Sequence, residues 1–169
     1  MRYTRVVLLI FAMFAATAAT AAYAESNAQA AFEKLKSLQG SWSGKGMEGH
    51  SLQVTFRVVS GGSAVMSEIQ GEHESDMITV FHLDGDRLLM THYCGVGNQP
   101  RMVGAMSADG KTISFRFLDA TNVLSTQPGH MEEMTLNMPD SNHHTEAWDF
   151  QQQDGKTEHH ALFDLQRVQ

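Results

Sequence analysis

Apolar and polar side chains alternate with a period of two through most of the chain after His50. This period is typical of β-strands that bury one face, because successive side chains point to opposite sides. Short turn sequences interrupt it at Gly61-Gly62, Asp84-Gly85-Asp86, Asp109-Gly110 and Asp154-Gly155. The sequence therefore predicts an all-β fold of about ten short strands. Nearly every sequential pair is a hairpin, which favours an antiparallel up-and-down β-barrel over a sandwich.

The hairpin turns also predict which side chains share a face. Across the turn at residues 84–86, Phe81 pairs with Met90, and His92 and Cys94 continue the same face. In the last hairpin, the residues expected on one face are His144, Glu146, Trp148, Phe150, His159, Ala161, Phe163 and Leu165. We expect both sets to point into the barrel, because they carry most of the apolar side chains of their strands.

Two segments precede the alternating region. Ala28–Leu38 is rich in alanine, has apolar residues near helical spacing and is followed by Gly40, so we expect a short N-terminal helix. The next segment, Gly40–Gly46, has glycines on both sides of Trp42. Glycine inside a strand often marks a bend or the close approach of another backbone, as a barrel corner requires.

The first 24 residues have the pattern of a secretory signal peptide. Arg2 and Arg5 precede the apolar run Val6–Phe14, and Ala22-Tyr23-Ala24 fits a small-x-small cleavage site. The apolar run is too short to cross a bilayer as a helix. We therefore expect a periplasmic or secreted protein with residues 1–24 removed, one domain at 25–169 and no membrane span.

The charge of the chain limits its partners. Loss of the two arginines in residues 1–24 would take the formal net charge from −7 to −9. An acidic chain without a cluster of lysines and arginines is expected to bind neither nucleic acid nor an anionic membrane. Cys94 is the only cysteine, so the domain has no internal disulfide and depends on packing. The sequence indicates no oligomeric state.

Chemically capable side chains are densest in Arg87–Met102, RLLMTHYCGVGNQPRM. Polar groups inside a barrel are costly unless they are paired or hydrated, so we interpret those expected there as the polar ends of a ligand pocket. These polar residues are His92, Cys94, His144, Glu146 and His159. The expected walls are Met77, Phe81, Met90, Phe115, Phe117, Met134, Trp148 and Phe163. The expected rim is Asn98, Gln99 and Arg101, where strict alternation turns Arg101 outward unless Pro100 shifts the phase.

A cysteine-dependent enzyme is one alternative. Cys94 would be the nucleophile, His92 or His159 the base, and Glu146 the group that orients the base. No residue is fixed as an oxyanion hole, although the loop at residues 95–98 could offer backbone N–H groups. We therefore favour binding without chemical turnover.

Metal binding is another alternative, because the chain has nine histidines and eleven methionines and His/Met ligation suits copper. Adjacent pairs such as His143-His144 and His159-His160 point to opposite faces of a strand and cannot chelate together. The best local cluster, Gly129-His130-Met131 with Met134, is a weak signal, since such methionines also serve as deformable lining. No metal site is predicted.

A helix followed by Gly-x-Trp-x-Gly, up-and-down strands and a last strand ending Phe163-x-Leu165-x-Arg167 resembles the calycin group of lipocalins, fatty-acid-binding proteins and nitrobindin. More narrowly, Thr91-His92-Tyr93-Cys94 with Asn98-Gln99-Pro100-Arg101-Met102 is similar to exported bacterial proteins of unknown function with a lipocalin-like pattern. The calycin resemblance implies a barrel that holds a small apolar or amphipathic ligand.

Nitrobindin implies haem instead, with His144 or His159 as the candidate iron ligand. Its motif continues into a Gly-x-Tyr-Pro run, whereas this chain has Met47-Glu48-Gly49-His50 after Gly46. Haem binding therefore stays an alternative, as does a structural or partner-binding domain without a ligand.

Overall fold

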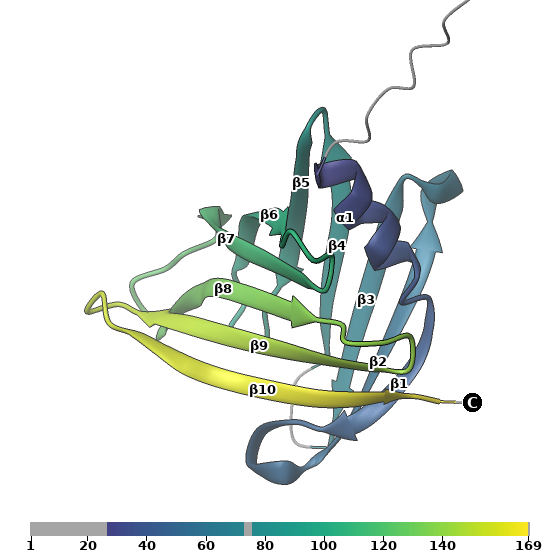
Figure 1. Ribbon diagram of the computed structural model, residues 1–169. Helices are drawn as coiled ribbons and strands as arrows, with labels where there is room; N and C mark the ends of the chain where they lie inside the picture. Colours follow the sequence, from purple (N-terminus) through teal and green to yellow (C-terminus); the bar gives the residue numbers. More distant parts are fainter. Residues whose placement is uncertain (1–26, 73–75, 169) are drawn as a thin grey trace, which may run out of the picture.

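The structure is a computed structural model that describes residues 27–72 and 76–168. The signal peptide predicted at residues 1–24 lies outside the described residues. Within them, one α-helix precedes ten antiparallel strands that close into a barrel, which confirms the predicted fold class (Figure 1). In the described part of the chain, no helix is both long and apolar enough to cross a membrane.

The elements in chain order are α1 (Asn27–Lys36), β1 (Gly40–Lys45), the 3-10 turn η1 (Met47–Gly49), β2 (Ser51–Val59), the 3-10 turn η2 (Ser60–Gly62), β3 (Ala64–Gly71), β4 (Met77–Asp84), β5 (Arg87–Tyr93), β6 (Gln99–Met106), β7 (Thr112–Thr121), β8 (Gly129–Asn137), β9 (His143–Gln152) and β10 (Thr157–Arg167).

Each strand pairs with its neighbours in sequence, and β1 pairs with β10 to close the barrel. The predicted hairpin registers are confirmed for β2 with β3, where Phe56 faces Ser67, and for β4 with β5, where Phe81 faces Met90. Burial follows the alternation, since every second residue of β5 is buried. The period of two in the sequence therefore reports which side chains point inward.

The seam between β1 and β10 explains a glycine beside Trp42. Gly44 lies opposite Leu165, and a Cβ atom built on Gly44 would stand 1.8 Å from the backbone oxygen of Asp164. No side chain fits at that distance, so only glycine lets the first and last strands meet. The close backbone approach predicted for Gly40–Gly46 is confirmed.

Helix α1 covers one end of the barrel. Its buried side chains, which include Phe32 and Leu35, belong to the barrel core, and α1 packs against β6, β4 and β5 (Figure 1). The side-chain amide of Asn27 donates a 3.0 Å hydrogen bond to the carbonyl of Met106 at the end of β6. The helix therefore closes the end of the barrel that carries the β4–β5 and β6–β7 turns.

Arg167 fastens the same end. Its guanidinium lies 4.2 Å from the ring centroid of Trp42 and donates hydrogen bonds to the carbonyls of Ser37 and Gln39 between α1 and β1. The indole N–H of Trp42 donates to the carbonyl of Leu38 at 2.8 Å. These contacts tie the last strand to the helix connection, so this end of the barrel is sealed.

A bulge in β10 changes the face of one predicted pocket residue. His159 lies opposite Asp149, whereas the next pair joins Ala161 to Trp148, so His160 is inserted between them. The side chain of His159 is 57% exposed, and its Nδ1 lies 3.0 Å from Oδ1 of Asp149. The prediction that His159 points into the barrel is wrong, because strict alternation counted from the preceding turn leaves no room for an inserted residue.

Candidate functional site

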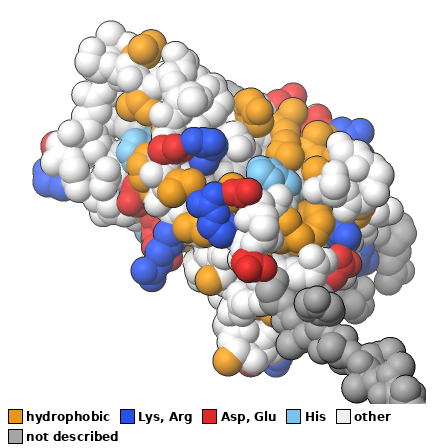
Figure 2. Space-filling model, turned by 90° about the horizontal axis from the view of Figure 1, so that it is seen from above, with side chains coloured by type: hydrophobic (Ala, Val, Ile, Leu, Met, Phe, Trp, Pro, Cys, Tyr) orange, Lys and Arg blue, Asp and Glu red, His pale blue; other side chains and the backbone are white. Residues whose placement is uncertain are grey.

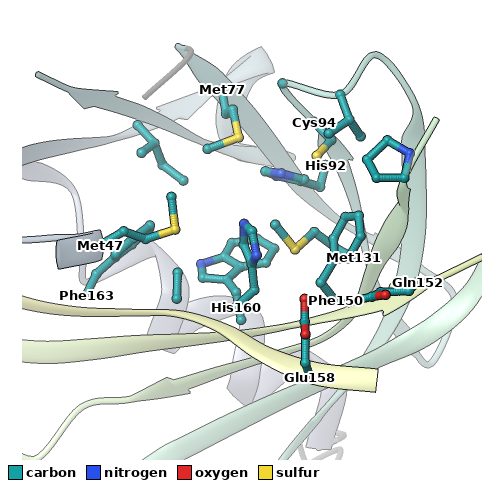
Figure 3. A pocket seen from close by; sticks show the side chains of 16 residues that line it. Met47, Met77, His92, Cys94, Met131, Phe150, Gln152, Glu158, His160 and Phe163 are labelled. Atoms are coloured by element: carbon teal, nitrogen blue, oxygen red, sulfur yellow. The ribbon is translucent and has the colours of Figure 1, made fainter. Parts of the chain in front are cut away.

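A pocket of about 570 Å³ opens at the end of the barrel away from α1 (Figure 3). It lies where η1 and the loops after β5 and β7 meet the ends of β9 and β10. The lining residues are Met47, Ile69, Met77, His92, Cys94, Gly95, Val96, Pro128, Met131, Trp148, Phe150, Gln152, Glu158, His160, Ala161 and Phe163. The interior is therefore open at this end and packed with side chains at the other.

His92 contributes a buried imidazole to the pocket wall. It lies on the inner face of β5 with 1% of its surface exposed, and its Nδ1 is 2.9 Å from the hydroxyl oxygen of Thr79 on β4. Burial lowers the pKa of His92 to about 4, so the ring is neutral near pH 7. Its other nitrogen, Nε2, has no hydrogen-bond partner in the protein. The ring therefore lines the pocket and keeps one unpartnered nitrogen buried in its wall.

Trp148 on β9 supplies a second free nitrogen. Its ring centroid lies 4.6 Å from that of His92, and its side chain is 2% exposed. Its indole N–H is buried and has no partner in the protein. A buried polar group without a partner costs about 1–3 kcal/mol, so two unpartnered nitrogens on neighbouring rings are a marked feature of this pocket.

Cys94 ends the inner face of β5 and is 9% exposed. Burial raises the pKa of its thiol, although backbone hydrogen bonds from Val96 and Gly95 act in the opposite direction. The thiol is therefore protonated near pH 7 and is a weak nucleophile. This state favours binding over the cysteine-dependent enzyme.

The predicted rim residues hold the loops together and do not line the pocket. Asn98 is fully buried, and its amide donates a 2.7 Å hydrogen bond to the carbonyl of Gly129. Gln99 bonds to the carbonyl of Gly97 and accepts a hydrogen bond from the hydroxyl of Thr121.

Arg101 follows the strict alternation and points outward. It forms a two-point ion pair with Asp119, in which its Nε lies 2.6 Å from Oδ1. This contact with Arg101 lowers the pKa of Asp119. Arg101 is thus not available to bind a ligand carboxylate inside the barrel.

His144 and Glu146 point inward, as predicted, but lie below the pocket and do not line it. Their side chains pair with each other, with His144 Nε2 3.2 Å from Glu146 Oε1. The edge of the His144 ring meets Trp42 with 4.3 Å between centroids, and Phe56 packs on the same imidazole. They form part of the sealed end, where they join the helix connection to the core.

The predicted pocket residues thus separate by depth. His92, Cys94, Trp148 and Phe163 line the pocket, whereas Phe81, Met90 and Phe115 are buried in the core beneath it with His144 and Glu146. Of the other expected walls, Met77 lines the pocket, Met134 belongs to the core, and Phe117 stacks on His130.

Several lining residues were not predicted. Met47 comes from η1 and Pro128 from a loop, where no strand period applies. His160 reaches the pocket through the β10 bulge and packs on Phe150 with 5.3 Å between ring centroids. Glu158 precedes it at the pocket mouth (Figure 3).

The pocket carries no positive side chain. Among the residues that the structure describes, the lining includes no lysine or arginine, and Glu158 is its one carboxylate. Elsewhere on the surface several charges are paired, as between Arg57 and Glu68, and Figure 2 shows acidic and basic side chains side by side between apolar patches. The mouth therefore disfavours an anionic ligand.

Comparison with known proteins supports the fold. No protein-family model matches the chain, and no curated protein matches it in sequence. Among solved structures, the barrel is similar to the crystal structure of Rv2717c from M. tuberculosis, with a TM-score of 0.59 and 15% identity, covering 82% of this chain and 98% of that chain. At this identity the likeness shows a common barrel fold and assigns no ligand.

Proposed function

We propose that the protein is an exported, lipocalin-like binding protein whose pocket holds a small, uncharged apolar molecule with one hydrogen-bonding group. The observation that carries this proposal is the pair of buried ring nitrogens, His92 Nε2 and Trp148 Nε1, which lie without a partner beside an apolar pocket. A ligand hydroxyl or amide group that accepts from the Trp148 N–H and donates to His92 Nε2 would satisfy both and remove their desolvation cost.

The charge expected of the ligand follows from the charged residues at the pocket mouth. Within residues 27–72 and 76–168, Glu158 is the one lining residue with a carboxylate or a basic side chain other than histidine, and the whole chain is acidic. An anionic ligand would be repelled by this negative charge and would find no lysine or arginine in the described lining to pair with. A neutral ligand meets no such repulsion. Fatty acids, which calycin barrels can hold, are therefore less suitable than neutral apolar molecules.

A matched pair of fluorescent probes tests this function. N-phenyl-1-naphthylamine is neutral, and 8-anilino-1-naphthalenesulfonate has the same rings with one added sulfonate. We expect the neutral probe to bind at least about tenfold more tightly, a difference of about 1.4 kcal/mol. Fluorescence titration of both probes measures the ratio, and Glu158→Gln is expected to reduce it.

Two phenylalanine substitutions on neighbouring residues of β10 locate the site. Ala161 lines the pocket, and Ala161→Phe is expected to block binding of the neutral probe. Leu162 points outward with 53% of its surface exposed, so Leu162→Phe is expected to leave binding unchanged. Trp148→Phe keeps an aromatic ring but removes the indole N–H, and it should weaken binding of the neutral probe. Equal binding by all of these variants would show that the probe binds elsewhere.

Haem is the second candidate ligand. The two histidines first considered as iron ligands do not fit, because His144 lies below the pocket and His159 lies outside the barrel. The pocket itself offers two other imidazoles, from His92 on β5 and His160 on β10, and either residue could hold iron.

Haem binding predicts a Soret band on titration with haemin, altered in His160→Ala and unchanged in His159→Ala. The two variants remove neighbouring histidines from opposite faces of β10 and so serve as a matched pair. No Soret shift in the unaltered protein would exclude haem and leave the neutral organic ligand.

A further inference from the structure

Sulfur atoms and one imidazole gather on the wall formed by β4 and β5. The register pairs Thr79 with His92 and ends with Ile78 opposite Tyr93, and Met77 and Cys94 are the next residues of the two chain segments beyond this last pair. Side chains on directly opposed strand positions have Cβ atoms about 5 Å apart, and His92 and Cys94 are neighbours on one face. Figure 3 shows Met77, Cys94 and His92 together on one side of the pocket.

The imidazole in this group is prepared for coordination. His92 Nε2 is buried and without a partner, while Nδ1 contacts the Thr79 hydroxyl at 2.9 Å. If Nδ1–H donates to Thr79, Nε2 carries the lone pair, which is the arrangement that orients metal-bound histidines.

The donor types indicate which metal fits. In the part of the chain that the structure describes, no group of three or more His, Cys, Asp or Glu side chains is placed to hold a metal ion. Zinc sites usually draw their protein ligands from these types. Here the third donor is a thioether, and Met47 and Met131 add two more sulfur atoms to the pocket lining. Thiolate and thioether ligands select Cu(I) among the common ions.

We propose that Cys94, His92 and Met77 bind one Cu(I) ion at the pocket wall. Binding breaks the S–H bond of Cys94, the proton passes to solvent, and the sulfur forms a bond to copper, which enters and stays as Cu(I). The proposal goes beyond the binding of an organic molecule and does not depend on it. Because both uses need the lone pair of His92 Nε2, copper and a ligand that hydrogen-bonds to this nitrogen would compete for it.

Competition against bicinchoninate under anaerobic conditions tests the site, with Cu(I) as the probe. We expect the unaltered protein to remove one equivalent of Cu(I) from the coloured bicinchoninate complex. Loss of an outer partner of a metal ligand already costs about 10–100-fold in affinity, and these three residues bind the ion directly. Cys94→Ser, His92→Phe and Met77→Leu should therefore each weaken Cu(I) binding by at least about tenfold. X-ray absorption should show both sulfur and nitrogen ligands.

Met138→Leu is the matched control, because Met138 is a buried methionine that does not line the pocket. It should bind Cu(I) as the unaltered protein does. Circular dichroism and thermal unfolding of each variant confirm that it is folded, and binding of the neutral naphthylamine probe to the unaltered protein tests the organic-ligand function separately.

Three results would overturn the copper site. These are failure of the unaltered protein to compete for Cu(I), loss of binding in Cys94→Ser alone while folded Met77→Leu and His92→Phe bind normally, and an equal loss in Met138→Leu. The second result would reveal a simple thiol adduct. None of them affects the result expected with the naphthylamine probe.

Discussion

Replacing Gly44 with alanine is expected to lower the free energy of unfolding by about 3 kcal/mol or more, and replacing it with valine to prevent folding. The added Cβ would stand 1.8 Å from the carbonyl oxygen of Asp164 and 2.9 Å from its carbonyl carbon. Both atoms belong to the backbone of β10, so no side-chain rotation relieves the overlap. The seam between β1 and β10 must open instead.

Gly85→Ala provides the control for this prediction. Gly85 lies in the β4–β5 turn with φ of 59°, and a Cβ there would meet no atom within 4 Å. The Gly85→Ala variant is therefore destabilised only by the strain of alanine in a left-handed conformation, about 1 kcal/mol. Urea unfolding followed by the fluorescence of Trp42 and Trp148 measures both variants. If Gly44→Ala costs no more than Gly85→Ala, the two strands do not meet as closely as the structure shows.

The pairing of β1 with β10 closes the barrel and also positions part of the pocket. Met47 follows β1 and Phe163 lies on β10, and both line the pocket. A barrel opened between these strands would lose one wall of its pocket, so Gly44→Ala should also weaken binding of the naphthylamine probe. The effect on binding would be indirect, through the position of η1.

The face of each side chain could largely be predicted from the sequence. The Asp84-Gly85-Asp86 turn fixes the parity of β4 and β5, and this alone placed His92 and Cys94 inside the barrel, as observed. In β9, the same argument correctly turned His144, Glu146 and Trp148 inward. Parity is reliable in β4 and β5 because their register runs without interruption. In β9 it is right because two shifts cancel: the last turn pairs Gln151 with Thr157, one residue earlier than a two-residue turn predicts, and the bulge in β10 restores the predicted pair of Trp148 with Ala161.

Parity fails where a strand contains an inserted residue. The bulge between His159 and Ala161 exchanges the roles of two adjacent histidines, so His160 and not His159 reaches the pocket. Nothing in the run Glu158-His159-His160-Ala161 marks this bulge, since it contains no glycine or proline.

The period of two also does not predict how far along the barrel axis an inward side chain lies. Phe81, Met90 and Phe115 share the inner face with His92, yet they lie in the packed core. The difference arises because α1 and Arg167 seal one end of the barrel, a tertiary contact between distant parts of the chain. The sequence predicted the helix and did not indicate which end it covers.

The stability of the protein is expected to fall as the pH is lowered from 7 to 4, in part because of His92. An unfolded histidine has a pKa near 6.5, whereas burial lowers that of His92 to about 4. Between these values the unfolded chain binds a proton that the folded chain excludes, so protonation favours unfolding. The contribution of His92 is fully present above pH 6.5 and is lost by about pH 4, a change of about 3 kcal/mol.

No described group around His92 carries a negative charge that would stabilise the protonated ring in the folded protein. Thr79 contacts its Nδ1, and Trp148 and Cys94 are its uncharged neighbours. Glu158, the one carboxylate among the described lining residues, stands at the exposed mouth. Urea unfolding at pH 7.5 and 4.5 should therefore show a drop in the unaltered protein that is larger than the drop in His92→Leu by about 2–3 kcal/mol. Comparing the two drops cancels the titration of the other carboxylates and histidines. An equal drop in both proteins would mean that His92 accepts a proton in the folded state, and its Nε2 would then be a charged donor and not the neutral group on which ligand binding depends.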